Sequence, residues 1–133
     1  MNILAAFKGQ YVTAVELGDK TATLTIGHVS LVKLEGEDGT IRERPVVYFS
    51  ETPRGWVLCK TTALSVAAMF GTETNGWTGK RVTLYAADVQ VGRERKPGLR
   101  VKGSPDLAAA VTFELKLPKK KTQSVTLSKT EAP

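Results

Sequence analysis

Basic side chains gather in one short stretch of the chain, residues 91–103, which reads VGRERKPGLRVKG. Residues 80–102 hold seven basic and two acidic residues, whereas residues 1–79 hold seven basic and eight acidic residues. A local excess of cations, unlike an even spread, indicates a surface that binds an anionic partner. Arginine and lysine side chains are suited to phosphate groups, so the stretch predicts contact with a phosphate-bearing polymer.

The chain lacks the groups of residues from which catalytic and metal sites are usually built. His28 is the only histidine and Cys59 the only cysteine, and neither belongs to a metal-binding spacing such as CxxC or HExxH. The stretch GWTGKR lacks the rest of a phosphate-loop motif. We therefore expect no enzyme activity, no metal and no cofactor. We interpret His28 as a structural residue and Cys59 as a small core residue.

Most of the sequence has the two-residue periodicity of strands, with apolar residues alternating with threonines and charged residues. The predicted strands cover residues 8–17, 21–36, 41–51 with a continuation at 56–59, 80–91 and 98–103. Helical spacing predicts a helix over residues 60–71. Thr61 or Thr62 would cap the start of this helix, and Gly71 would end it.

The order of three strands, one helix and two strands predicts an all-β protein with one helix. It favours the OB-fold, a five-stranded Greek-key barrel with its helix between strands three and four. An SH3-like barrel is the nearest alternative, but it normally lacks a full helix at that position. We assign the OB-fold domain to residues 1–105, an additional strand or short helix to residues 106–117, and a flexible basic tail to residues 118–133.

Binding of single-stranded nucleic acid needs cations along the phosphates and aromatic faces for the bases. Alternation along the predicted strands places both kinds of side chain on the outer face of the barrel, with Tyr48 as a second aromatic platform. The remaining outer-face residues are Arg81, Thr83, Tyr85, Arg100 and Lys102, and Lys80, just before the fourth strand, is a further binding candidate. The loop between the fourth and fifth strands would supply a phosphate clamp of Arg93, Arg95 and Lys96. Trp56 and Trp77, which flank turns, are expected to anchor the helix and loop in the core.

Three segments of the chain, WVLCKTTALSVAAMFG, WTGKRVTLY and GLRVKG, resemble OB-fold single-stranded DNA-binding proteins of phages and prophages. The resemblance covers about residues 56–102. It implies that Lys60 and Thr61 open the helix and that Trp77, Gly79 and Lys80 form the turn before the fourth strand. It also implies that Tyr85 and Arg100 lie on the binding strands. The chain departs from the family at Thr62, where the family has Asn. Its basic C-terminal segment also differs from the acidic tip of bacterial single-stranded DNA-binding proteins.

These observations predict a protein that binds single-stranded DNA without sequence preference, in phage DNA replication or recombination. The alternatives are an RNA-binding OB protein and a protein-interaction module with which a phage targets a host protein. Candidate partners are single-stranded DNA, further copies of the chain in a homodimer or higher homo-oligomer, and replication or recombination proteins. No stretch of the sequence is apolar enough to span a membrane or to act as a signal peptide. We therefore expect a cytoplasmic protein, in the host cell if a phage encodes it.

Overall fold

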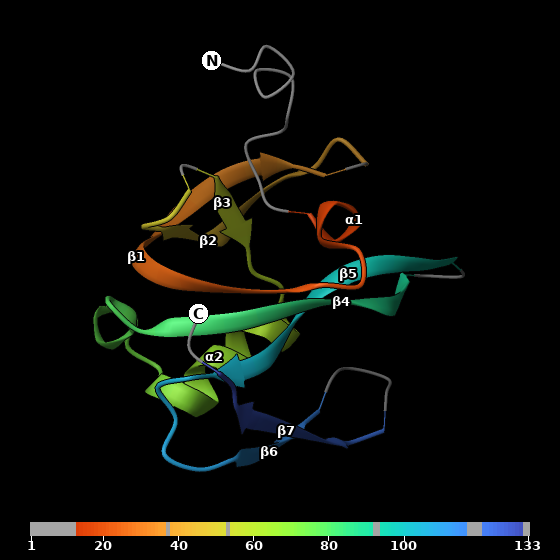
Figure 1. Ribbon diagram of the computed structural model, residues 1–133. Coiled ribbons are helices and arrows are strands. Elements are labelled where there is room, and N and C mark those ends of the chain that lie inside the picture. The colour runs from red at the N-terminus through yellow and green to blue at the C-terminus, as the bar shows by residue number, and fades with distance from the viewer. Residues whose placement is uncertain (1–12, 37, 53, 92–93, 117–120, 132–133) are drawn as a thin grey trace.

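The computed structural model describes residues 13–131 except 37, 53, 92–93 and 117–120. These residues form a mostly β structure with one full helix, α2, which lies between β4–β5 and β6–β7 in the view of Figure 1. The elements are α1 (Ala14–Leu17), β1 (Thr21–Glu35), β2 (Ile41–Phe49), β3 (Gly55–Val57), α2 (Lys60–Phe70), the 3-10 helix η2 (Thr74–Trp77), β4 (Arg81–Val91), β5 (Glu94–Ser104), β6 (Val111–Leu115) and β7 (Gln123–Lys129). The α-helices among the described residues have four and eleven residues, too few to cross a bilayer.

The strands of the described residues form one open sheet in the order β3-β2-β1-β4-β5-β7-β6. Three consecutive strands, β1 to β3, are joined by short connections, and β4 returns past α2 to lie beside β1. This is the Greek-key arrangement. The expectation of an all-β protein with one helix is confirmed, but the expectation of a closed five-stranded barrel is wrong, because the sheet has seven strands and two free edges.

The barrel stays open because the edge of β5 is taken by another strand. Closure would need β3 to bridge to β5, and β3 has only three residues. Instead, Gly103 and Ser104 of β5 pair in parallel with Ser128 and Lys129 of β7. A Cβ atom at Gly103 would overlap the backbone of Ser128, so the glycine is what allows the two strands to approach.

Two terminal segments differ from the expectation, and one open choice is settled. Within the predicted strand over residues 8–17, residues 14–17 form α1, a single turn ended by Gly18 at a φ of 63°, and residues 8–12 lie outside the described residues. The segment expected as a flexible tail, residues 118–133, contains β7. Residues 111–115 form the strand β6, where the sequence left strand and short helix open. The other predicted strands and the helix over residues 60–71 are confirmed within a few residues, and β5 begins earlier than predicted.

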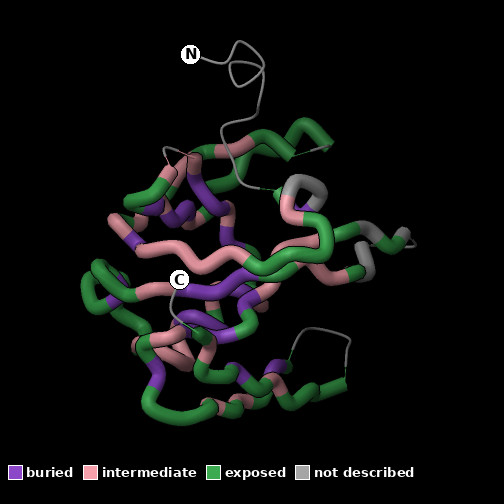
Figure 2. Tube along the Cα trace, viewed as in Figure 1, coloured by how far each residue is buried: buried purple, intermediate pink, exposed green. Residues whose placement is uncertain are grey.

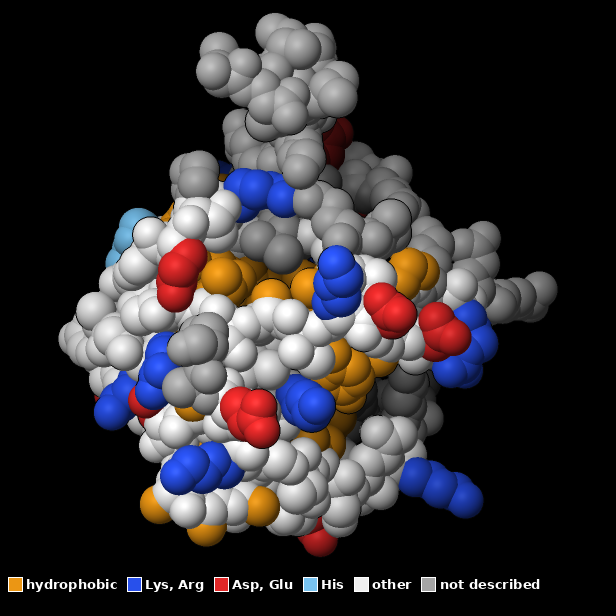
Figure 3. Space-filling view, viewed as in Figure 1, with side chains coloured by type: hydrophobic (Ala, Val, Ile, Leu, Met, Phe, Trp, Pro, Cys, Tyr) orange, Lys and Arg blue, Asp and Glu red, His pale blue; other side chains and the backbone are white. Residues whose placement is uncertain are grey.

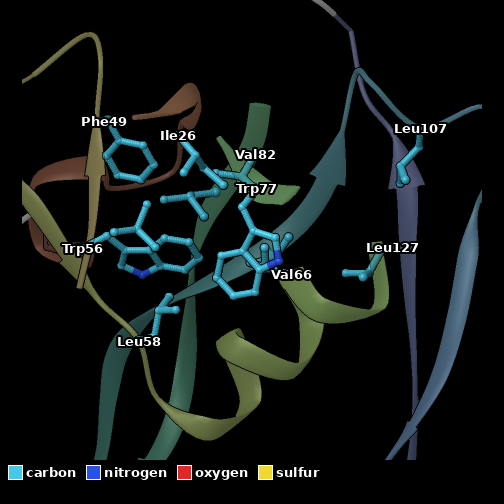
Figure 4. Close-up of a cluster of buried hydrophobic side chains, with 12 residues drawn as sticks. Ile26, Phe49, Trp56, Leu58, Val66, Trp77, Val82, Leu107 and Leu127 are labelled. Atoms are coloured by element: carbon cyan, nitrogen blue, oxygen red, sulfur yellow. The ribbon is translucent and has the colours of Figure 1, made fainter. Parts of the chain in front are cut away.

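The core lies between the inner face of the sheet and α2 (Figure 4). Trp56 stacks on Phe49 with ring centroids 6.1 Å apart, and the Trp77 indole N–H donates to the carbonyl of Gly71 at 2.8 Å. Both tryptophans are buried, which confirms their predicted anchoring role. Figure 2 shows that burial is concentrated around this core, whereas the far end of the β1–β2 hairpin is exposed.

The N-terminus of α2 is capped by Cys59, which was expected to be a core residue. Cys59 is exposed, and its backbone N–H donates to the Thr62 hydroxyl at 2.9 Å. The Cys59 sulfur in turn accepts a hydrogen bond from the backbone N–H of Thr62, which completes a capping box. Thr62 therefore stabilises the helix start from its third position, while neither Thr61 nor Thr62 is the cap residue itself.

Replacing Gly103 with alanine is expected to destabilise the protein, because the new methyl group would force β5 and β7 apart. Overpacking of this kind lowers the free energy of unfolding by about 1–3 kcal/mol, and urea denaturation followed by circular dichroism would measure it. Gly76→Ala is the matched control, since its Cβ would meet only the Phe70 carbonyl at 3.6 Å. Equal stabilities of the two variants would contradict the role assigned to Gly103.

Candidate nucleic-acid interface

Tyr85 lies near the centre of the outer face of the sheet. In the strand register it is opposite Thr21 of β1 and Arg100 of β5. Directly opposite residues of antiparallel strands project to the same face, so this row combines an aromatic ring, a hydroxyl and a guanidinium group. Tyr85 is 37% exposed, which leaves part of its ring open to a planar ligand. The structure thus brings Tyr85 and Arg100 together, and their role in binding stays a prediction.

Arg100 is half-buried, and its guanidinium reaches groups of the protein. Its Nη1 donates to the carbonyl of Leu99 at 3.0 Å and lies 3.8 Å from Cys59 Sγ. Burial raises the pKa of the Cys59 thiol, but hydrogen bonds with Thr62 and the charge of Arg100 outweigh burial and lower this pKa overall. The Arg100 side chain is therefore partly occupied at the start of α2, which reduces its freedom to follow a ligand.

Lys102 occupies a β-bulge of β5. Leu84 pairs with Val101 and Thr83 with Gly103, so Lys102 is the extra residue between the two pairs. A bulge bends a strand and changes the direction of its side chains. Lys102 is exposed and lines the same hollow as Tyr85, so the bulge places a lysine ammonium on the Tyr85 side of the sheet.

Two outer-face residues named from the sequence are held by other parts of the chain. Thr83 is only 3% exposed, because its hydroxyl lies between those of Thr23 and Thr130 at 2.8 and 2.7 Å. The expectation that Thr83 faces a ligand is therefore wrong. Arg81 forms an ion pair with Asp106 at 2.8 Å, and its backbone N–H donates to the same carboxylate.

The second aromatic platform consists of two rings. Tyr48 of β2 stacks on His28 of β1 with centroids 4.8 Å apart and an angle of 18° between the rings. The two residues are opposite each other, next to the bulge at Gly27, and His28 is exposed. Sequence reasoning treated His28 only as a structural residue, although its position on a predicted strand was a signal that it could face outward.

The remaining cations named from the sequence lie at two ends of β4. Lys80 is exposed in the turn before β4. Arg95 is exposed on β5 and pairs with Gln90, and Lys96 pairs with Val89. The β4–β5 ladder therefore continues past these residues, so Arg95 and Lys96 belong to a two-stranded arm, where a loop was expected. Arg93 lies outside the described residues, as does the side chain of Lys96.

A hollow beside Tyr85 contains residues that sequence reasoning did not name as binding candidates. Lys20 comes from the turn that follows α1, and Thr126 and Ser128 come from β7. Thr21, which alternation places on the outer face, lines the hollow from the start of β1. The signal for β7 was present, because Val125 and Leu127 alternate with hydroxyl residues. The signal was overridden by the polar composition of the C-terminal segment. The position of Lys20 next to Tyr85 depends on the β1–β4 pairing and has no local signature.

The carboxylates of Glu51 and Asp106 hydrogen-bond with Thr25 of β1 and Arg81 of β4. Burial raises the pKa of Glu51, but hydrogen bonds from the backbone N–H and hydroxyl of Thr25, at 2.7 Å each, outweigh it and lower the pKa. Hydrogen bonds from the Arg81 side chain lower the pKa of Asp106. A carboxyl group whose pKa is lowered by folding adds stability above its ordinary pKa and loses it as the pH falls through the lowered value.

Stability is therefore expected to fall as the pH drops below about 4, the ordinary pKa of carboxyl groups, because the unfolded chain then takes up protons more readily than the folded protein. In thermal melts, Glu51→Gln and Asp106→Asn should each lower the melting temperature at pH 7. Between pH 7 and pH 3, the melting temperatures of these variants should fall less than that of the parent protein. Glu73→Gln, in the loop before η2, changes the net charge equally and serves as the control. The same pH dependence in all four proteins would contradict the roles of both carboxylates.

Comparisons with protein-family models, with curated proteins and with solved structures found no match for this chain. The chemistry of the outer face is therefore the basis on which a function can be proposed.

Proposed function

We propose that the protein binds single-stranded DNA without sequence preference through the outer face of β1, β4 and β5. The observation that carries the proposal is that Tyr85, which is 37% exposed, and the exposed Lys102 line the same hollow of this face. An aromatic face stacks on any base, and a cation beside it neutralises the adjoining phosphate. Neither contact reads base identity, so the surface fits a ligand of any sequence.

The ligand is single-stranded because Tyr85 needs an unstacked base. In a duplex both faces of each base are covered by its neighbours, so a tyrosine on a sheet could reach only the backbone. The Tyr48–His28 pair offers a second aromatic surface on the same face. Tyr48 alternates along β2 with Val47 and Phe49, which are buried in the core, so its side chain projects to the outer face. Two aromatic surfaces on one sheet suit a strand that passes across several β-strands.

We also propose that β1 to β5 represent an OB-fold whose barrel is open between β3 and β5. The Greek-key order and the position of α2 between β3 and β4 support this proposal, since the OB-fold is a partly open five-stranded Greek-key barrel. In that fold, oligonucleotides bind at a face of the sheet and at the loops that flank it. The Tyr85 surface and the basic β4–β5 arm correspond to such a face and such a flanking element.

The resemblance of residues 56–102 to phage single-stranded DNA-binding proteins supports a role in phage DNA replication or recombination. Unpaired strands arise as intermediates in both processes, and a sequence-tolerant protein would cover them. Such a protein would act in the cytoplasm of the host cell. Basic residues distributed over the sheet and the β4–β5 arm would make its affinity depend strongly on salt.

Fluorescence anisotropy with labelled oligo-dT is the direct test of the proposal. We expect binding at low salt that weakens steeply between about 50 and 200 mM salt, with weaker binding to the matched duplex. Competition with an RNA oligomer of matched sequence separates a DNA-binding from an RNA-binding protein. An absence of binding at low salt would refute the proposal and favour a protein-interaction module.

Tyr85→Ala is expected to weaken oligo-dT binding by about 5- to 150-fold, which corresponds to roughly 1–3 kcal/mol for one base stack. Tyr85→Phe keeps the ring and should bind like the parent protein. Lys102→Ala should reduce the slope of log affinity against log salt by about 0.7, the value for one phosphate of a single strand. The control is Lys33→Ala, because Lys33 alternates to the other face of β1. An equal effect of Lys102→Ala and Lys33→Ala would contradict the proposed binding surface on β1, β4 and β5.

A further inference from the structure

The hollow beside Tyr85 has walls from four parts of the chain. It has a volume of about 360 Å³, near the lower end of the range for small-molecule sites. The walls come from the turn after α1, from β4, from the bulge of β5 and from β7. Figure 3 shows a recess on this face, with hydrophobic side chains inside it and Lys or Arg side chains at its rim.

The side chains that line the hollow match the three parts of a nucleotide. Tyr85, with Ala86 and Val101 beside it, provides an apolar and aromatic wall for a base. Lys20 and Lys102 provide two cations for a phosphate. The hydroxyl groups that could hydrogen-bond with a sugar or a base edge belong to Thr21, Thr126 and Ser128. Asp19 also lines the hollow. Its carboxylate could accept a hydrogen bond from an amino group of a base, and its negative charge would repel a phosphate placed near it.

The hollow is fixed in shape by contacts on three sides. The hydroxyl chain Thr23–Thr83–Thr130 connects β1 and β4 to the residue that follows β7. The close approach of Gly103 and Ser128 fixes β7 against β5. On the opposite side, α1 packs against both β4 and β5, and Gly18 turns the chain so that Lys20 and Thr21 reach the rim. A site formed before the ligand arrives loses little entropy on binding.

We infer that this hollow holds one nucleotide of the bound strand, with its base against Tyr85 and its phosphate between Lys20 and Lys102. The inference rests on the proposed function and adds a defined subsite to it. The volume fits one nucleotide, so the neighbouring nucleotides of the strand lie on the open sheet surface. The subsite depends on β7 and on the turn after α1, two elements outside the five strands of an OB-fold.

The test is an NMR titration of the isotope-labelled protein with the mononucleotide dTMP and, separately, with the oligomer (dT)12. We expect dTMP to cause saturable shifts at the amides of Lys20, Tyr85 and Thr126. Thymidine without its phosphate, and inorganic phosphate alone, should each bind more weakly than dTMP. Saturable shifts confined to another region of the protein would overturn the inference.

Two variant pairs locate the site. Thr126→Phe would fill the hollow and should abolish the dTMP shifts, while Ser124→Phe adds the same ring on the same face of β7 outside the hollow and should leave them intact. Lys20→Ala removes only an exposed charge and should weaken dTMP binding by about tenfold, while Lys33→Ala should not. Unchanged dTMP binding in Thr126→Phe and Lys20→Ala would refute the subsite.

The two oligonucleotide titrations separate failure of the subsite from failure of the proposed function. If (dT)12 binds and dTMP does not reach the hollow, the subsite is wrong and single-strand binding stands. If dTMP binds in the hollow and (dT)12 does not bind, the protein has a mononucleotide site and the proposed function is wrong. If neither ligand binds, both proposals are wrong.

Discussion

The bend of β1 at Gly27 is the constraint on which the rest of the sheet depends. Residues 21–25 of β1 pair with β4, and from Ile26 onward β1 pairs with β2. A side chain at Gly27 would press on the Tyr48 carbonyl at 3.1 Å, so the glycine allows the strand to turn there. Ile26, next to the bend, accepts a hydrogen bond from the Gly79 N–H and donates one to the Lys80 carbonyl, both at 2.8 Å. These bonds attach the start of β4 to the bend, so one strand sets the positions of both halves of the Greek key.

The same bend explains why the aromatic side chains occur in two groups on one face. Tyr85 belongs to the half of the sheet around β4, and the Tyr48–His28 pair belongs to the half around β2. Between them the outer face of β1 carries the threonine hydroxyls of residues 21, 23 and 25, of which Thr23 joins the hydroxyl chain and Thr25 binds Glu51. Because the hydroxyls of Thr23 and Thr25 are bonded within the protein, the surface between the aromatic groups is ordered and polar. A strand lying across it would therefore meet a rigid path.

Sequence reasoning succeeded where local patterns decide structure. The helix α2 has apolar residues at helical spacing and ends at Gly71, and β1, β2 and β4 show clear alternation, so all four could be predicted. The sequence AVEL of α1 suits either a strand or a helix, and the choice depends on the turn at Gly18. The strand β7 was missed because the polar composition of its segment outweighed the alternation of Val125 and Leu127. Its pairing with β5 also depends on the absence of a side chain at Gly103, where Ser128 lies against the backbone. Alternation predicted that Tyr85 and Arg100 share one face of the sheet. The burial of Thr83, the ion pair of Arg81 and the position of Lys20 depend on contacts that no local pattern contains.

The two arginines of the outer face, Arg81 and Arg100, have hydrogen-bond partners within the protein. Arg81 is held by Asp106 through both its backbone and its guanidinium, and Arg100 bonds to the carbonyl of Leu99. Arginine forms fixed, planar contacts of this kind, whereas lysine carries a compact charge on a flexible stem. The two lysines that line the hollow, Lys20 and Lys102, are both exposed. Arg81 thus ties the start of β4 to the segment after β5, while the exposed lysines would be able to adapt to the proposed ligand, a division that would suit a surface that accepts phosphates in many positions.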